Sequence, residues 1–380
     1  MHLEIYLDNS ATTQVAQPVA DRMVEVMTRQ YGNPSSLHRK GFLAERAMEE
    51  ARAQLAGVLS AAPEELTFTA CGTEANNLAL LGYCRANRRT GTTVITTQVE
   101  HSSVLGPAAQ LAAEGFTVLR LPPRADGTVD PQAVADAVDG STLLVSVMAV
   151  NSETGAINDL AAIARLAKAK NPRVRIHSDA VQAFCRLPLQ PRRMGIDLLT
   201  ASAHKLHGPK GVGLLYAAKG VRLAPLQYGP DQERGLRPGT QNLPGICGFA
   251  LAARLLWEQR VQNDAHFTNL SNFLREKALQ IPGVCINSPV DGAPYIMNLS
   301  IPRVRSEVMI HYLEDAGIYV SSGSACGRGK PSHVLTAMGL PPHRIDGALR
   351  VSFSVHSTTQ EVEAFCQRLA QGLDTLAGRR

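Results

Sequence analysis

The residues best suited to chemistry lie directly after short apolar runs that indicate strands. One run, 198–202, leads into Ser202, His204 and Lys205. A lysine amine that is removed from water has a lowered pKa and can form a Schiff base with an aldehyde. The alternative for Lys205 is an ordinary solvated lysine on a glycine-rich loop. The pattern raises covalent aldehyde chemistry as a hypothesis that the neighbouring sites must support.

A second site lies at Cys71-Gly72-Thr73-Glu74, between a predicted strand and a predicted helix. Free backbone N–H groups and the positive end of the helix dipole favour an anion at such a position, most plainly a phosphate. The alternative for Thr73 is a simple N-cap. Gly72 and Thr73 are therefore candidate phosphate ligands.

Acidic, aromatic and amide side chains follow three other predicted strands. His101 follows the run 93–97, and Asn151 follows the run that ends at residue 150. Asp179 ends a buried run, and Gln182 faces the same way if a helical turn begins there. A buried carboxylate requires a cationic or N–H partner. The alternative for Asp179 is a cap on the next helix.

Together these sites supply a phosphate cradle, an imidazole, an acid for a ring nitrogen and a lysine for an aldehyde. That inventory is what pyridoxal 5′-phosphate requires. Competing motifs are missing, because Gly329-Lys330 runs into Pro331 and no GxGxxG follows a strand. No carboxylate completes a metal site with His204 and His207, so we expect no metal.

The elements that must position these residues alternate in type along the first part of the chain. Short apolar runs separated by helices of 10 to 15 residues are typical of βαβ units and a mostly parallel sheet that binds ligands at its carboxyl edge. We expect strands at 66–70, 93–97, 116–121, 142–150, 174–178, 198–202 and 212–216, and helices at 74–88, 104–114, 131–138 and 160–170.

The pattern changes after residue 216. A stretch rich in proline and glycine, 224–245, predicts an extended loop, and a long helix is expected over 246–263. The remainder indicates a second, smaller α/β domain. Its expected strands are 295–301, 319–321 and 349–353, and its expected helices are 307–316 and 360–376.

Composition narrows the class of protein. The chain has 380 residues, of which 44% are hydrophobic and 19% charged, which excludes disorder as its main state. The excess of Lys and Arg over Asp and Glu, 38 against 33, is small and dispersed, so we expect no nucleic-acid partner. Apolar stretches fall well short of the roughly 18 residues of a membrane span. We expect a cytoplasmic protein with no membrane partner.

The seven cysteines are an odd number without any CxxC spacing, which fits neither a disulfide framework nor a zinc ribbon. Cys326 is the exception among them, because it lies in a Ser/Gly segment with Arg328 and Lys330 close by, where a thiolate is favoured. We expect the other six to be packing residues, with Cys71 uncertain because it borders the predicted phosphate loop.

A series of motifs, in order along most of the chain, resembles the cysteine desulfurases, in the class V branch of fold-type-I pyridoxal-phosphate enzymes. Ser321-Ser322-Gly323-Ser324-Ala325-Cys326 resembles the active-site segment of the NifS/IscS-like group. The other motifs are Asp8-Asn9-Ser10-Ala11-Thr12-Thr13, Tyr31-Gly32-Asn33-Pro34-Ser35-Ser36, Gly72-Thr73-Glu74-Ala75-Asn76-Asn77, Glu100-His101, Asn151-Ser152-Glu153-Thr154-Gly155, Asp179-Ala180-Val181-Gln182, Ser202-Ala203-His204-Lys205 and Arg237-Pro238-Gly239-Thr240.

The resemblance implies a fold-type-I transferase fold, with a large domain built on a mixed, mostly parallel sheet and a smaller α/β C-terminal domain. The large, cofactor-binding domain would span 15–257. The small domain would combine 1–14 with 258–380 and carry the loop with the catalytic cysteine. The resemblance also implies a homodimer.

The resemblance assigns roles to the candidate residues. Lys205 would hold the cofactor and move the substrate's α-proton, and His101 would stack on the ring and act as general acid or base. Asp179 would pair with the ring nitrogen, and Gln182 would bond the ring hydroxyl. The phosphate ligands would be Gly72, Thr73, Ser202, His204 and, from a second subunit, Thr240; the substrate carboxylate would be held by Asn151 and Arg350.

The implied reaction converts L-cysteine to L-alanine and leaves the sulfur on Cys326 as a persulfide, for a sulfur-acceptor protein such as an iron–sulfur scaffold. The loop between Cys326 and Pro331 is shorter than the family pattern. The alternatives are a related class V aminotransferase or selenocysteine lyase in which Cys326 is incidental, and a scaffold that has lost catalysis.

Overall fold

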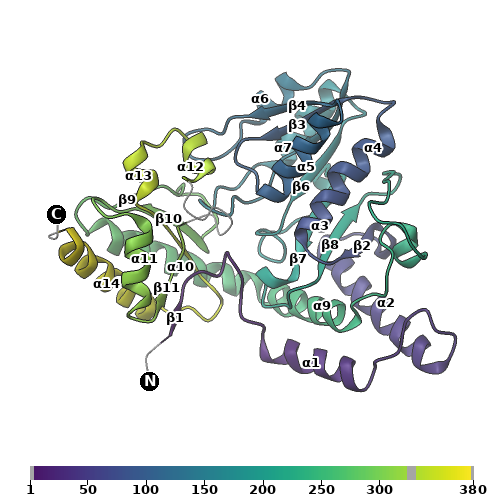
Figure 1. Cartoon of the computed structure of the whole chain (residues 1–380), viewed down its shortest axis with the longest axis horizontal. Coiled ribbons are helices and arrows are strands. Elements are labelled where there is room, and N and C mark those ends of the chain that lie inside the picture. The colour runs from purple at the N-terminus through teal and green to yellow at the C-terminus, as the bar shows by residue number, and fades with distance from the viewer. Residues whose placement is uncertain (1–3, 323–330, 378–380) are drawn as a thin grey trace.

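A seven-stranded sheet forms the centre of the computed structural model, which describes residues 4–322 and 331–377 (Figure 1). One strand, β8, runs antiparallel to both of its neighbours, and the other neighbouring pairs are parallel. The mixed, mostly parallel sheet expected from the sequence is thereby confirmed. The strand order is β2 (Leu66–Thr69), β8 (Gly213–Ala217), β7 (Leu198–Ser202), β6 (Arg175–Asp179), β5 (Thr142–Ser146), β3 (Thr93–Thr97) and β4 (Thr117–Leu121).

Strands β3, β5 and β7 are buried along their whole length, which explains their mostly apolar or β-branched sequences. The expected strand at 142–150 ends earlier, at Ser146. The N–H groups of Val147 and Ala149 still bond to carbonyls of β6, but the regular ladder stops. The helices between the strands are α3 (Gly72–Asn77), a π-helical turn (Leu78–Gly82), α4 (Tyr83–Asn87), α5 (Ser102–Ala113), α6 (Pro131–Ala137), α7 (Leu160–Lys170) and α8 (Pro191–Met194).

The long helices that pack around α9 differ from the sequence expectation. The helices α1 (Gln17–Thr28) and α2 (Arg39–Leu59) were not expected, and both pack against α9 (Leu243–Glu258). The single helix expected over 246–263 is α9 followed, after a break at Gln259, by the longer α10 (Arg260–Leu279). Many of the buried positions of α2 and α9 are alanine or glycine, so the apolar stripe is weak in the sequence.

A smaller α/β region contains the C-terminal part of the chain, on the left of Figure 1. Strand β10 (Ile296–Ser300) pairs antiparallel with β9 (Cys285–Ile286) and β12 (Ala348–Ser352). The helices are α11 (Ser306–Glu314), α12 (His333–Ala337), α13 (Pro342–Asp346) and α14 (Thr359–Ala377). Among the described residues, no helix has the length and apolar character needed to cross a membrane.

The segment near the N-terminus joins this smaller region. Strand β1 (Ile5–Tyr6) pairs in parallel with β11 (Ile318–Tyr319), and the Ser352 N–H bonds the Leu7 carbonyl at 2.7 Å. The following residues then cross to the large sheet, where the Thr13 N–H bonds the His204 carbonyl at 2.9 Å. The division at 15–257 stays a prediction.

A buried ion pair fixes the long loop after β8. Arg52 of α2 donates from both terminal nitrogens to Glu233, at 2.8 and 2.9 Å, and also to the Leu66 carbonyl. The Glu233 carboxylate accepts a further bond from the Phe68 N–H at 2.9 Å. Glu233 has a left-handed backbone, with φ of 47°, so this bonded side chain holds a strained residue in place.

We expect Arg52→Ala to lower the free energy of unfolding by about 3–5 kcal/mol, because the Glu233 carboxylate would stay buried without its cation. Urea unfolding followed by circular dichroism measures the change. Arg46→Ala is the matched control, since Arg46 pairs with Glu50 on the exposed surface of the same helix and should cost less than about 1 kcal/mol. Equal losses in the two variants would contradict the role of the buried pair.

Candidate active site

The predicted site residues converge at the carboxyl edge of the parallel strands. Asp179 is the last residue of β6 and Ser202 the last residue of β7. His101 lies between β3 and α5, and Asn151 lies beyond β5. Because these strands run in the same direction, their carboxyl ends meet at one edge, as the strand-end argument required.

One corner of this edge suits an anion. The Gly72 backbone lies so close to Val181 that an added Cβ would be 2.9 Å from Val181 Cγ2. Glycine, which has no Cβ, avoids this clash. The Ser202 hydroxyl is buried and lacks a hydrogen-bond partner among the described residues. A buried hydroxyl without a partner is unusual in a folded protein, and a bound phosphate oxygen would satisfy it. Thr73, at the start of α3, is exposed to the same corner.

Lys205 follows β7 in a short 3-10 turn (Ala203–Lys205). Its amine donates to the carbonyls of Ser10 and Ala11, the latter at 2.7 Å. Burial, and next the charge of Arg350, lower the pKa of Lys205 to about 7. A neutral amine, the form that attacks an aldehyde, is therefore available near neutral pH.

Two residues from the stretch 8–13 also hold the neighbours of Lys205. The Ser10 carbonyl accepts a bond from the Gln182 amide at 3.0 Å, and the Thr12 hydroxyl bonds His204 Nδ1 at 3.2 Å. The other amide atom of Gln182, Oε1, is buried without a partner among the described residues. From the sequence this stretch was recognised only as a motif, and no contact with the lysine was predicted for it.

The Asp179 carboxylate is held from two sides. Its Oδ1 accepts from the Val181 N–H at 3.0 Å, and its Oδ2 accepts from the Asn76 amide at 2.7 Å. A strand-end carboxylate with two N–H donors meets the requirement for burial in its charged form. An ionised carboxylate at this place can pair with a protonated ring nitrogen.

His101 is the N-cap residue of α5. Its Nδ1 accepts from the Ser103 N–H at 3.1 Å and lies 2.7 Å from the Ser103 hydroxyl. Burial lowers the pKa of His101, so the ring is neutral at physiological pH. Neither Ser103 nor Asn76 was assigned a role from the sequence, although both lie within or beside the quoted motifs.

Arg350 lies near Asn151, because it bonds the backbone carbonyl of the next residue, Ser152. The Asn151 amide donates to the Val99 carbonyl at 3.1 Å, and its oxygen accepts from the next turn, so it shapes the loop. Arg350 donates to the Ser152 carbonyl at 2.9 Å and pairs with Asp8 at 2.8 Å. Its Nε is buried without a partner among the described residues. The substrate-binding role of both residues stays a prediction.

Two buried carboxylates near the site were missed at the sequence level. Burial raises the pKa of Glu100 to about 8, and the nearby charge of Asp179 adds to the shift. Glu153 accepts a bond from the Ser332 hydroxyl, the N-cap of α12, and burial raises its pKa as well. Both residues belong to the motifs named in the sequence analysis, and their positions just after strands could have identified them as site residues.

The remaining predictions concern Thr240 and the thiols. Thr240 is exposed, and its side chain forms no hydrogen bond with the other site residues that the structure describes. Cys326 lies outside the described residues. Four other cysteines are buried and Cys71 is half-buried, but Cys285 is exposed on the two-residue strand β9, so its expected packing role is wrong.

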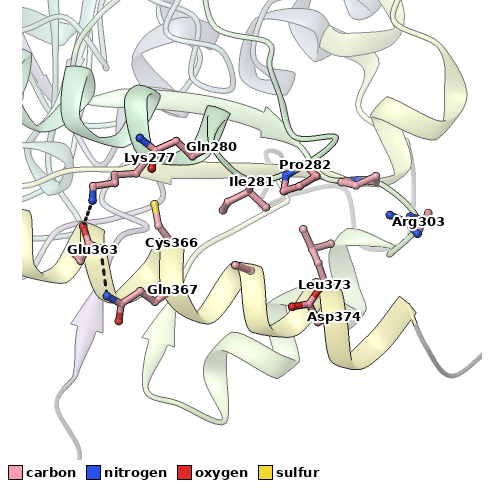
Figure 2. A pocket seen from close by; sticks show the side chains of 12 residues that line it. Lys277, Gln280, Ile281, Pro282, Arg303, Glu363, Cys366, Gln367, Leu373 and Asp374 are labelled. Atoms are coloured by element: carbon pink, nitrogen blue, oxygen red, sulfur yellow. Dashed lines mark hydrogen bonds and ion pairs between the residues drawn. The ribbon is translucent and has the colours of Figure 1, made fainter.

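A separate groove of about 590 Å³ lies between α10 and α14 (Figure 2). The ion pair between Lys277 and Glu363 spans one end of it at 3.0 Å, and Cys366 lines its wall. Burial raises the pKa of the Cys366 thiol to about 12, so this thiol is not a nucleophile near neutral pH. None of the predicted site residues lines the groove.

The chain matches the family described as "Aminotransferase class-V" over residues 5–365. It is 39% identical over 372 residues to a Bacillus subtilis (strain 168) protein named "Putative cysteine desulfurase IscS 1", covering 96% of this chain and 97% of that one. A Methanosarcina thermophila protein named "Cysteine desulfurase IscS" is 38% identical, with 94% and 89% covered. A solved structure named "NIFS-LIKE PROTEIN" has a TM-score of 0.94 at 37% identity, with 98% and 100% covered.

The lowered pKa of Lys205 predicts how its reactivity depends on pH. The neutral amine is the reactive form, so labelling by a small aldehyde should rise as the pH increases through about 7 and fall away below it. Reductive trapping at a series of pH values, read by mass spectrometry of the Lys205 peptide, measures the midpoint. The exposed Lys210 serves as the control for general amine labelling. A midpoint near that of a free lysine, about pH 10, would contradict the prediction.

Proposed function

The chain belongs to the aminotransferase class-V family and is a pyridoxal-phosphate-dependent cysteine desulfurase, and we propose that it passes the sulfur of L-cysteine to Cys326. The observation that carries this assignment is the buried Lys205 amine, held at the same sheet edge as Asp179 and His101. L-Alanine is the other product.

The described residues fit pyridoxal 5′-phosphate at this edge. When bound, the cofactor supplies an aldehyde carbon for an amine and a ring that stabilises negative charge at the substrate's α-carbon. The partnerless hydroxyl of Ser202 suits a phosphate oxygen, and the partnerless Oε1 of Gln182 suits the ring hydroxyl. The residues that would hold the cofactor are Lys205, Gly72, Thr73, His101, Asp179, Gln182, Ser202, His204 and Thr240.

Lys205 is the group that moves the α-proton in this proposal. Its neutral amine accepts a proton at Nζ, and the carbonyls of Ser10 and Ala11 stabilise the ammonium that results. His101 keeps a proton on Nε2, because its Nδ1 accepts a bond from the Ser103 backbone N–H. The two groups thus divide the work of taking and giving protons.

The sulfur step balances with Cys326 as the nucleophile. Its thiolate attacks the substrate sulfur, and an S–S bond forms as the Cβ–S bond of the substrate breaks. The electron pair of the broken bond stays on Cβ, which takes up a proton and becomes the methyl group of alanine. The outer sulfur of the persulfide then passes to an acceptor thiol.

Arg350 is the proposed partner of the substrate carboxylate, together with Asn151. The Arg350 guanidinium is 3% exposed and keeps a free Nε–H, while Asp8 and the Ser152 carbonyl fix its other nitrogens. A buried guanidinium held in this way is an anchor for a carboxylate. The pairing with Asp8 means that substrate binding rearranges an existing ion pair.

We expect Cys326→Ala to reduce sulfide release from L-cysteine under reducing conditions by more than about 100-fold, because the nucleophile is lost. The variant should still bind cofactor, which absorbance reports. Cys285→Ala, which removes the exposed thiol of β9, is the matched control and should retain activity. Equal sulfide release by wild type and Cys326→Ala would favour a lyase in which Cys326 is incidental.

The proposal includes a homodimer in a reducing cytoplasm that delivers sulfur to an acceptor protein, such as an iron–sulfur scaffold. Large apolar side chains remain exposed on α1, on the segment after it and at the start of α2, which supports a covering partner. They include Val24, Met27, Tyr31, Leu37 and Phe42. A second subunit could also bring Thr240 to the phosphate corner.

Sedimentation equilibrium tests the dimer directly. We expect a mass of about twice the 40.8 kDa of one chain. Leu37→Asp, at a fully exposed position, should shift the equilibrium toward monomer by placing a charge in the apolar contact, whereas Val290→Asp, also exposed but on the smaller region, should not. A wild-type monomer would contradict the dimer and the role of Thr240.

A further inference from the structure

We propose that Asn76 and Ser103 are positioning residues that set the tautomer of His101 and link it to the carboxylate of Asp179. Among the described residues, neither side chain is a hydrogen-bond partner of the Lys205 amine, which bonds the carbonyls of Ser10 and Ala11. Asn76 and Ser103 form a chain of hydrogen bonds that connects the Asp179 carboxylate to the His101 ring. The inference rests on the cofactor site proposed above.

Asn76 stands at the centre of this chain, in the first turns of α3. It is fully buried, and its amide nitrogen donates to Asp179 Oδ2 at 2.7 Å and to the Ser103 hydroxyl at 2.9 Å. Its oxygen is buried without a partner among the described residues. Exchanging the amide oxygen and nitrogen would place an oxygen against the carboxylate, so Asp179 fixes the amide orientation.

Ser103 passes that orientation on to His101. Its oxygen accepts the hydrogen of the Asn76 amide, so its own hydrogen is free to point at His101 Nδ1, 2.7 Å away. The Ser103 N–H bonds the same nitrogen at 3.1 Å. With two donors directed at Nδ1, that nitrogen carries a lone pair and the single proton of the neutral ring lies on Nε2.

The consequence is chemical. His101 enters the reaction as a proton donor from Nε2, because the alternative tautomer would set an Nδ1–H against the Ser103 backbone N–H, which cannot turn away. The direction of the chain is imposed by the charge on Asp179, so the group that pairs with the ring nitrogen also selects the donor on the ring face. The other titratable groups that face His101 are Lys205 beyond β7 and His333 of α12.

The full chain labelled with ¹⁵N-histidine tests this inference without turnover. A two-bond proton–nitrogen correlation spectrum separates protonated from unprotonated ring nitrogens, and His101→Gln assigns the signal among the 11 histidines. We expect the wild type to show its proton on Nε2. Ser103→Ala should shift the tautomer ratio about fivefold toward Nδ1–H, the value of one hydrogen bond.

Two neighbouring residues supply matched controls. Ser102→Ala removes an exposed hydroxyl from the same helix turn, and Asn77→Ala removes an amide that bonds only the Thr73 carbonyl of its own helix. Both should keep the wild-type tautomer. Asn76→Ala should shift it as Ser103→Ala does, and if that variant fails to fold, Ser103→Ala decides alone.

A proton on Nδ1 in the wild type, or an unchanged tautomer ratio in Ser103→Ala, would overturn the inference. The spectrum is recorded on the chain without substrate, so it tests the tautomer of His101 independently of the proposed activity. A chain that released no sulfide could still show the Nε2–H tautomer, and an active chain could fail to show it.

Discussion

The removal of the Lys205 amine from water is the constraint on which the rest of the site depends. Burial costs a charged amine far more than a neutral one, and this difference brings its pKa down to about 7. The sheet buries this amine, because Lys205 follows the end of β7 at the edge where the neighbouring parallel strands also end. The carbonyls of Ser10 and Ala11 then accept hydrogen bonds from the amine.

Charges around this lysine are arranged in opposition. The positive charge of Arg350 lowers the pKa of Lys205, whereas the negative charges of Asp8 and Asp179 raise it. The electrostatic effects of these neighbours therefore partly cancel. Glu100 lies near Asp179, and burial together with the charge of Asp179 raises the pKa of Glu100 to about 8. Near neutral pH Glu100 is therefore mostly protonated, and in the proposed site the Asp179 carboxylate would face the ring nitrogen without a second charged carboxylate beside it.

The sequence predicted the parts of the site that depend on local order. Asp179 and Ser202 could be placed because a parallel sheet gathers strand ends, whatever else surrounds them. Asn76 could not, because its role comes from contact with Asp179, a hundred residues away, and with Ser103. Helix α2 was missed since alanines form much of its buried stripe, and Cys285 was misplaced because β9 is a short edge strand.

Strand β1 pairs with β11, so the two parts of this contact become available in a definite order during synthesis of the chain. The carbonyls that face Lys205 belong to a segment synthesised early, yet that segment is held in place by Tyr319 and Ser352, which are made last. A growing chain on the ribosome therefore contains β1, the large sheet and Lys205 before it contains the strands that pair with residues 5–7. The contact of residues 5–7 with the smaller region is one of the last parts of this structure that a growing chain can complete.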